Sequence, residues 1–285
     1  MDDREGQMTL RDKIGCSAKR DSLEDALTWA AEKDYHYLEF NADREPNHLF
    51  SWSDERVRGI RETCDRESIH IGLHSLSAVN VAEFSPYLSE ATDEYHKGYI
   101  DLAVRLKCEW IVVHSGFYQG GAIEARLTAA VEHLRFAADY AEKCDVLLLL
   151  ENHNREPDNA EMHYFTHNVE ECRYYFDRLQ SSHMGWAFNI THANLVPEGI
   201  DGFLDEFGID RIGQVRLADN RGDIEGDLRP GDGNIDFVSL FRRLNSSGYT
   251  NHYNLQFGAR TEELEARNEL AALYDKLYDK LYDKE

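Results

Sequence analysis

The chain has 285 residues, of which 42% are hydrophobic and 11% aromatic, and its formal net charge is −23. This length favours one α/β barrel over a small β-sandwich and is sufficient to bury a sizeable core. No apolar run reaches the roughly 18 residues of a transmembrane helix, and the strong negative charge disfavours nucleic acid and anionic membranes as partners.

Eight short apolar runs alternate with amphipathic stretches along the whole chain. A run such as VLLLL is typical of a strand that is buried on both faces of a parallel sheet. Eight such units without a linker predict a (β/α)8 TIM barrel as one domain over residues 1–285, with a doubly wound open sheet as the alternative. The predicted strands cover residues 14–18, 37–40, 69–75, 110–116, 146–152, 184–192, 212–220 and 252–258.

The stretches between the strands predict amphipathic helices, for example over residues 22–33, 93–107 and 124–143. We expect residues 1–12 to be a polar N-terminal extension and residues 259–284 to form a last helix. That segment contains LYDK three times, so Leu273, Leu277 and Leu281 recur at every fourth position. This spacing predicts an apolar stripe that packs on the outside of the barrel. The alternative is a contact between copies of the chain in a homo-oligomer.

Polar side chains follow the apolar part of nearly every predicted strand. Active sites of such barrels lie at the C-terminal ends of the strands, although alternate strand residues point to opposite faces. One histidine at such a position is more often a packing residue, but three histidines and a glutamate at successive strand ends indicate a functional pocket. The candidates are Glu39, His74, His114, Glu151, His153, Asn189, His192, Arg216, Asp219 and Gln256.

A long charged segment, DNRGDIEGDLRPGDG (219–233), follows the seventh predicted strand. Such a loop is expected to form a rim or lid over the pocket, with Asp219 and Asn220 bracing it. In GDGNIDF (231–237) the two glycines permit a tight turn, and Asp236 is expected to cap the following helix. Rossmann and P-loop phosphate-binding motifs are absent from the sequence.

The motifs at the strand ends resemble those of the xylose isomerase-like barrel superfamily. They occur in the same order and at similar spacing, as HSLSAVN (74–80), VVHSG (112–116), LLENH (149–153), FNITHA (188–193), VRLADNRG (215–222) and GDGNIDF (231–237). The superfamily includes sugar isomerases and epimerases, inosose and dehydroshikimate dehydratases, and endonuclease IV. The resemblance therefore implies the same barrel, and chemistry on a small substrate at its mouth.

The resemblance also implies a divalent metal held by Glu, Asp, His and Glu, from the ends of strands five to eight. The matching residues here are Glu151, Asn189, Arg216 and Gln256. The family's ligands keep one net negative charge after a divalent ion binds, whereas these four residues are neutral together without an ion. Asn and Gln keep the shapes of Asp and Glu without their charge, and Arg cannot become a ligand. We therefore expect a site that works without the usual metal, and predict no firm cofactor.

A second metal arrangement stays open. In endonuclease IV-like members, two histidines and the shared glutamate hold a zinc ion, and the matching residues are His74, His114 and Glu151. Two histidines and one carboxylate are a suitable set for a single catalytic zinc. The alternative is that the histidines bind substrate or each other. A three-metal nuclease is disfavoured because His192 and Asp227 match, but Arg229 stands in place of a histidine.

The leading hypothesis is an isomerase, epimerase or dehydratase acting on a small polyhydroxy or keto-acid substrate. The predicted catalytic residues are Glu151, His114, His192 and Arg216, with Arg216 in the electrophilic role of the metal. The predicted substrate-binding residues are His74, Asn189 and Gln256, with an apolar wall of Trp186, Phe117 and Tyr118. The alternatives are a sugar- or carboxylate-binding barrel without chemistry and a zinc hydrolase of the abasic-site endonuclease type.

The remaining expectations concern compartment and redox state. Cysteines occur at five scattered positions without CxxC spacing, which predicts reduced thiols. The start MDDREGQMTLRDK lacks the features of a secretory signal, so a cytoplasmic location is expected.

Overall fold

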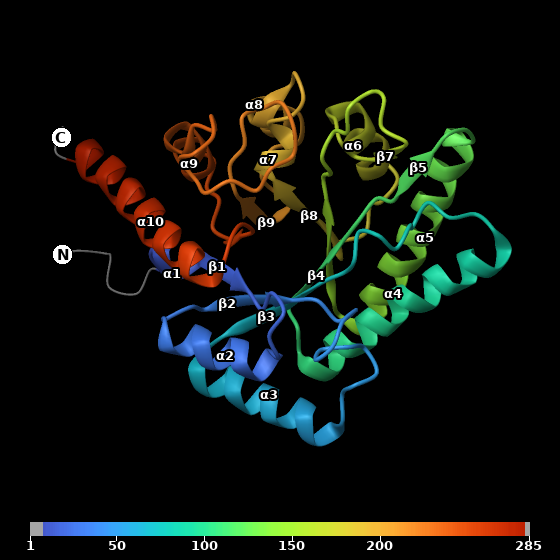
Figure 1. Ribbon diagram of the computed structural model, residues 1–285, viewed down its shortest axis with the longest axis horizontal. Helices are drawn as coiled ribbons and strands as arrows, with labels where there is room; N and C mark the ends of the chain where they lie inside the picture. Colours follow the sequence, from blue (N-terminus) through green and yellow to red (C-terminus); the bar gives the residue numbers. More distant parts are fainter. Residues whose placement is uncertain (1–7, 283–285) are drawn as a thin grey trace.

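The computed structural model describes the backbone of residues 8–282 and the side chains of residues 8–277. Eight parallel strands close into a barrel surrounded by helices, which confirms the predicted architecture (Figure 1). Around the barrel the order is β1, β2, β3, β4, β6, β8, β9 and β10, and β10 pairs with β1. Their bounds are β1 Ile14–Ser17, β2 Tyr37–Phe40, β3 His70–His74, β4 Trp110–Val113, β6 Leu147–Glu151, β8 Met184–Asn189, β9 Ile212–Leu217 and β10 His252–Leu255.

Helices connect the strands on the outside of the barrel. They are α1 Leu10–Lys13, α2 Leu23–Glu32, α3 Asp54–Glu67, α4 Pro86–Leu106, α5 Ile123–Cys144, α6 Val169–Phe176, α7 Ile190–Ala193, α8 Gly199–Phe207, α9 Phe237–Ser246 and α10 Arg260–Tyr282. Side-chain caps mark several starts: Ser22, Ser53 and Asp236 each accept a backbone N–H of the first turn. The cap at Asp236 confirms the prediction from the sequence. Helix α4 begins seven residues before the predicted start because Pro86 suits its first turn.

Several features differ from the sequence-based expectation. Leu10, in the predicted polar extension, is buried and begins α1. The predicted strands 110–116, 212–220 and 252–258 end earlier, at Val113, Leu217 and Leu255.

The sixth predicted strand, 184–192, ends at Asn189, because the Asn189 carboxamide oxygen accepts the N–H groups of Thr191 and His192 and caps α7. A second, antiparallel sheet of two strands also forms from loops on the upper right of Figure 1, β5 Phe117–Gln119 and β7 Met162–Tyr164. Each of its strands has three residues, too few for a periodic pattern to predict.

Large side chains fill the lower interior of the barrel opposite glycines on neighbouring strands. Trp110 and Leu149 belong to a separate apolar cluster inside the barrel, together with Val112 and Ala187. A Cβ at Gly72 would lie 2.0 Å from the Trp110 ring, and one at Gly185 would lie 2.8 Å from Leu149. Trp110 and Leu149 thus close the bottom of the barrel, and polar residues occupy the layers above them.

The C-terminal helix α10 packs on the barrel near α1, α9 and β1 (Figure 1). Leu277 is buried and Leu273 is partly buried against the core, as the repeated leucines predicted. The side chain of Leu281 lies outside the described residues. The buried Arg267 donates to the backbone carbonyls of Lys33 and Asp34, so α10 also caps the end of α2. A contact between copies through α10 stays a prediction.

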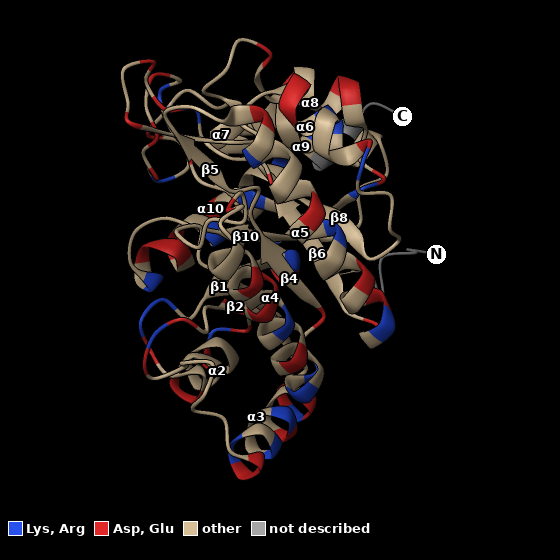
Figure 2. Cartoon of the chain, turned by 90° about the vertical axis from the view of Figure 1, so that its right-hand side faces the viewer, with Lys and Arg blue, Asp and Glu red and all other residues tan. Residues whose placement is uncertain are grey.

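Acidic residues are distributed over many helices and loops and do not form one segment (Figure 2). All five cysteines are free, as the sequence predicted. Within residues 8–282, no helix is both long enough and apolar enough to cross a bilayer.

The contact between Gly72 and Trp110 gives a test of the interior packing. Gly72→Ala forces the indole ring to move and should lower the free energy of unfolding by about 1–3 kcal/mol. Urea denaturation measures this change. Gly59→Ala is the matched control: no atom lies within 4 Å of its added Cβ, and alanine should stabilise α3 by about 0.5–1 kcal/mol. Wild-type stability of Gly72→Ala would contradict this packing.

Candidate active site

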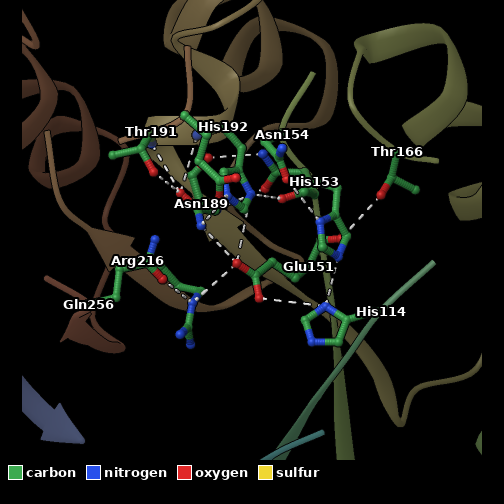
Figure 3. A network of polar contacts seen from close by, with 12 residues as sticks. His114, Glu151, His153, Asn154, Thr166, Asn189, Thr191, His192, Arg216 and Gln256 are labelled. Carbon is green, nitrogen blue, oxygen red and sulfur yellow. Dashed lines mark hydrogen bonds and ion pairs between the residues drawn. The ribbon is translucent and has the colours of Figure 1, made fainter. Parts of the chain in front are cut away.

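Polar side chains at the ends of six barrel strands form the site, and Figure 3 shows how His114, Glu151, Asn189, Arg216 and Gln256 lie toward one another. His74, Glu151 and Asn189 end β3, β6 and β8, and Arg216 is the next-to-last residue of β9. His114 and Gln256 directly follow β4 and β10. The structure thus brings these predicted residues together, and His153 and His192 join them from the loop after β6 and from α7.

Arg216 points into the barrel and is only 3% exposed. Its Nη1 donates to both carboxylate oxygens of Glu39 at 2.9 and 3.1 Å, and its Nε donates to Gln256 Oε1 at 2.8 Å. The Nε also lies 3.3 Å from Glu151 Oε1. Burial lowers the pKa of Arg216, but Glu39 and Glu151 outweigh it and raise the pKa overall. The guanidinium is therefore a fixed cation between two buried carboxylates.

Glu39 lies beneath the other residues and is 2% exposed. Besides Arg216, four residues donate to it, at 2.9–3.4 Å: His74, Gln214, Trp110 and Asn254. Burial raises the pKa of its carboxyl, but Arg216 and His74 outweigh burial and hold the pKa well below its usual range. With Glu39 counted, two carboxylates face one guanidinium, so the cluster carries one net negative charge before any histidine is protonated. The sequence-based charge count missed this carboxylate.

The two oxygens of Glu151 have different surroundings. Oε1 accepts the Asn189 amide at 2.7 Å and lies beside Arg216. Oε2 is buried but accepts no hydrogen bond from the described residues, and its nearest basic neighbour is His74 Nε2 at 3.5 Å. Burial raises the pKa of Glu151, yet Arg216 and the surrounding histidines hold it well below its usual range. An ionised carboxylate oxygen without a partner is thus ready to bind a ligand or to accept a proton.

The amide at position 189 serves two neighbours at once. Its oxygen caps α7, and its nitrogen donates to Glu151. An aspartate at this position would place a second carboxylate against Glu151 and could not donate to it. Asn189 therefore fits a site in which Glu151 is charged and no metal separates the two side chains.

Three histidine rings lie in a row beside Glu151. His74 Nε2 is 3.1 Å from His114 Nε2, and His114 Nδ1 is 3.0 Å from His153 Nε2. Burial lowers the pKa of His114 well below its usual value, and burial together with the charge of His192 lowers that of His153 to about 4. Both rings are therefore neutral near pH 7. Tyr164 of β7 stacks on His153 with 4.2 Å between ring centroids.

His192 differs from these rings because its two nitrogens face acceptors. Nδ1 lies 2.7 Å from the carbonyl oxygen of Asn152, and Nε2 lies 3.2 Å from Glu225 Oε1. Burial lowers the pKa of His192, but the contact with Glu225 and the charge of Glu151 outweigh it and raise the pKa. His192 is thus the ring best placed to carry a proton. The sequence contained no local signal for Glu225, which lies in the middle of the predicted rim loop.

The rim loop 219–233 is folded around the carboxylate of Asp219. Oδ1 accepts the N–H groups of Asn220 and Ile235, and Oδ2 accepts those of Gly231 and Gly233. Asp219 therefore braces the loop, as predicted, and does not face the pocket residues. Its bonds place the segment with Glu225 next to His192.

A cavity of about 280 Å³ opens beside this cluster. Its volume suits a small molecule. The lining is mostly polar and consists of Ser17, Lys19, Glu39, Phe40, Asn41, His74, Ser75, Leu76 and Ser77. The site therefore has room for a ligand next to His74 and above Glu39.

The predicted aromatic wall is wrong for Trp186 and Tyr118. Trp186 is fully buried outside the barrel against Phe188 and Phe203, because it alternates with the inward-facing Ala187. Tyr118 packs on Phe165 of the core. Phe117 lies at the rim, where its ring meets Tyr164 edge to face. Tyr164 is thus the aromatic residue nearest to the histidine row, and the sequence analysis missed it.

Comparisons with known proteins agree with this geometry. The sequence profile of xylose isomerase-like TIM barrels matches residues 27–276. An uncharacterized protein of Methanocaldococcus jannaschii, MJ1311, is 26% identical over 297 aligned positions, which cover 96% of this chain and 97% of the relative.

Solved structures of similar fold include proteins that are named as epimerases or as epimerase-like. A D-tagatose 3-epimerase-like protein has a TM-score of 0.82 at 22% identity, covering 94% of this chain and 99% of the other. A 3-keto-D-glucoside 4-epimerase from E. coli has a TM-score of 0.72 at 16% identity, covering 92% and 98%. At these identities the likeness extends to the fold.

The donor atoms do not fit the metal site that the resemblance implies. Of the four matching residues only Glu151 is a carboxylate, and the Arg216 guanidinium lies against it and bonds to Gln256. A divalent ion at this point would meet a fixed cation. The set His74, His114 and Glu151 fits better, since ligand atoms from all three lie within 4.8 Å of one another.

The bonds of Asp219 give a test of the rim loop. Asp219→Asn replaces one acceptor oxygen by an NH2 group, so two loop amides lose their partner, at a cost of about 1–3 kcal/mol. Hydrogen exchange should accelerate at the two amides that face the new NH2 group, either Gly231 and Gly233 or Asn220 and Ile235, and proteolysis within residues 221–230 should become faster. Asp232→Asn, an exposed position in the same loop, is the control. Unchanged protection of all four amides would show that Asp219 does not hold the loop.

Proposed function

The chain belongs to the family of xylose isomerase-like TIM barrels, and we propose that it is an isomerase, epimerase or dehydratase for a small polyhydroxy or keto-acid substrate. In this proposal the enzyme uses acid–base chemistry without the family's usual metal. The observation that supports it most is the Arg216 guanidinium, which lies against Glu151 at the position of a family metal ligand.

Glu151 is the general base in this proposal. Its Oε2 is buried and free of hydrogen bonds from the described residues, so its position suits it to take a proton from a substrate carbon or hydroxyl. The lowered pKa keeps the carboxylate ionised but weakens it as a base, so the assignment rests on geometry. Asn189 holds Oε1 and thereby fixes the direction in which Oε2 points.

His192 and Arg216 complete the proposed chemistry. His192 donates a proton because its contacts with Glu225 and Glu151 favour the charged ring. The Nη2 group of Arg216 points toward His74 and is the donor that we expect to bind a substrate oxygen. A guanidinium there polarises a carbonyl or stabilises an enolate oxygen, as preorganised donors do in other enzymes.

Gln256 limits which reaction is plausible. Epimerases of this family use two opposed carboxylates, and the second one is an amide here, tied to Arg216 through its oxygen. A two-base epimerisation is therefore disfavoured. A proton shuttle on one face of the substrate, or a dehydration, needs only Glu151 and an acid.

Substitution of Glu151 separates an enzyme from a binding protein. Glu151→Gln keeps the shape but removes the base, and we expect turnover to fall by about 10²–10⁴-fold. Proton NMR of a panel of ketoses, aldoses and sugar acids detects this loss. Glu55→Gln, on the exposed surface of α3, is the control. Wild-type protein that binds members of the panel without converting any of them would favour the binding barrel.

A single metal at His74, His114 and Glu151 is the second candidate. The free Glu151 Oε2 favours it, as do outer contacts that are typical of metal-bound histidines: His74 Nδ1 to Glu39 and His114 Nε2 to the carbonyl oxygen of Ser75. An ion held there would polarise a substrate oxygen or activate water. The nuclease alternative is weaker, because Arg229 bonds to Glu265 and Glu269 of α10 and does not join the site.

Cobalt titration tests this second candidate. A tetrahedral Co²⁺ site of two histidines and a carboxylate should produce visible absorption bands that saturate at one ion per chain. His114→Asn should abolish the bands, whereas His183→Asn, at a surface histidine of the loop before β8, should keep them. The absence of saturable bands in the wild type would remove this candidate.

A further inference from the structure

We propose that Glu39 is a positioning residue that holds Arg216 and His74 in their active orientation. This inference rests on the proposed function, because it assigns Glu39 a role in that same site. Glu39 lines the cavity together with His74, but in this proposal it acts through Arg216 and His74 and not on the substrate itself.

The Glu39 carboxylate is held by hydrogen bonds from several strands. One nitrogen of Arg216 is shared between both Glu39 oxygens, and His74 Nδ1 lies 2.9 Å from Oε1. Gln214, Trp110 and Asn254 donate to the same carboxylate from other strands. The carboxylate therefore cannot rotate without breaking hydrogen bonds on several sides. Its fixed orientation in turn fixes the orientations of Arg216 and His74, which are bonded to it.

Glu39 also affects the tautomer of His74. His74 Nδ1 lies 2.9 Å from the Glu39 carboxylate, which only accepts, and 3.2 Å from Arg216 Nη2, which only donates. Glu39 is thus the contact that favours a proton on this nitrogen of the neutral ring. Nε2 then keeps its lone pair and faces Glu151 Oε2 and His114. Without Glu39, the His74 ring could rotate or change tautomer. Its Nε2 would then become a donor instead of an acceptor toward Glu151 and His114.

Packing of the barrel interior does not require a charge at Glu39. Trp110, Val112, Leu149 and Ala187 form an apolar cluster inside the barrel, and the neutral amides of Gln214 and Asn254 lie against the Glu39 carboxylate. A buried ion pair is seldom more stable than apolar residues of the same volume, because both charges must be removed from water. Packing alone thus gives no reason for Glu39, whereas orientation of a buried guanidinium does.

Glu39→Gln tests the proposal with little change in volume. The amide turns one acceptor into a donor, which opposes either Arg216 or His74. We expect kcat to fall on the order of 10–100-fold, as for other residues that orient a catalytic group, with KM changed much less. Glu39→Asp keeps the charge and should recover part of the loss.

Asp93→Asn is the matched control. Asp93 forms a pair of the same kind with His133, at 2.6 Å between α4 and α5, outside the barrel. It should lower the stability in urea but leave kcat unchanged. Equal kcat values for Glu39→Gln and Asp93→Asn, both folded, would overturn the proposal.

If the wild type converts no substrate of the panel, the proposed function fails. Nitrogen-15 NMR of the histidine rings still tests whether Glu39 positions His74, because it needs no turnover. Glu39→Gln should change the tautomer signals of His74 and leave those of His133 unchanged. Asp93→Asn should change the signals of His133 and leave those of His74 unchanged. His74 signals that do not respond to Glu39→Gln would overturn the positioning role.

Discussion

The contact of one guanidinium with two buried carboxylates is the interaction on which the site depends. Arg216 lies between Glu39 and Glu151, and all three are nearly inaccessible to water. Removing Arg216 would leave two buried carboxylates without a cation, which costs several kcal/mol. A covalently attached cation cannot dissociate as a metal ion can, so the orientation of Glu151 is built into the chain itself.

The contact of Arg216 with Glu39 and Glu151 lies on an apolar layer of the barrel interior. Trp110 and Leu149 close the bottom, where glycines on neighbouring strands leave room for them. Trp110 also reaches upward, because its indole N–H donates to Glu39. The acidic layer therefore rests directly on the apolar one, and the amide groups of Asn189 and Gln256 connect it to the mouth of the barrel.

Much of the fold was predictable because parallel barrel strands are buried on both faces and therefore appear in the sequence as short apolar runs. The gathering of His74, His114 and Glu151 followed from the rule that strand ends share one edge. Alternation along β8 also places Trp186 outside the barrel, since Asn189 and Ala187 face inward. The period of two along a strand is therefore sufficient to exclude Trp186 from the pocket wall. The direction of Arg216 was harder to predict, because the β8–β9 pairing has a register shift at Trp186 and Ala187.

The roles of other site residues could not be predicted from local sequence. Glu39 was a strand-end candidate, but only its three-dimensional neighbours show that it supports Arg216. Glu225 reaches His192 because Asp219 folds the loop, which no pattern within that loop indicates. Tyr164 approaches His153 on a strand of three residues. In each case tertiary contacts place the residue, and local periodicity does not.

Metal content most directly tests the claim that a guanidinium has replaced the family's metal. The wild type and the triple variant Asn189→Asp, Arg216→His, Gln256→Glu would be loaded with Mn²⁺, freed of unbound ion and measured by mass spectrometry. The account predicts no retained ion in the wild type and about one per chain in the variant, whose ligand set then matches the family pattern. About one tightly held ion per wild-type chain would contradict it.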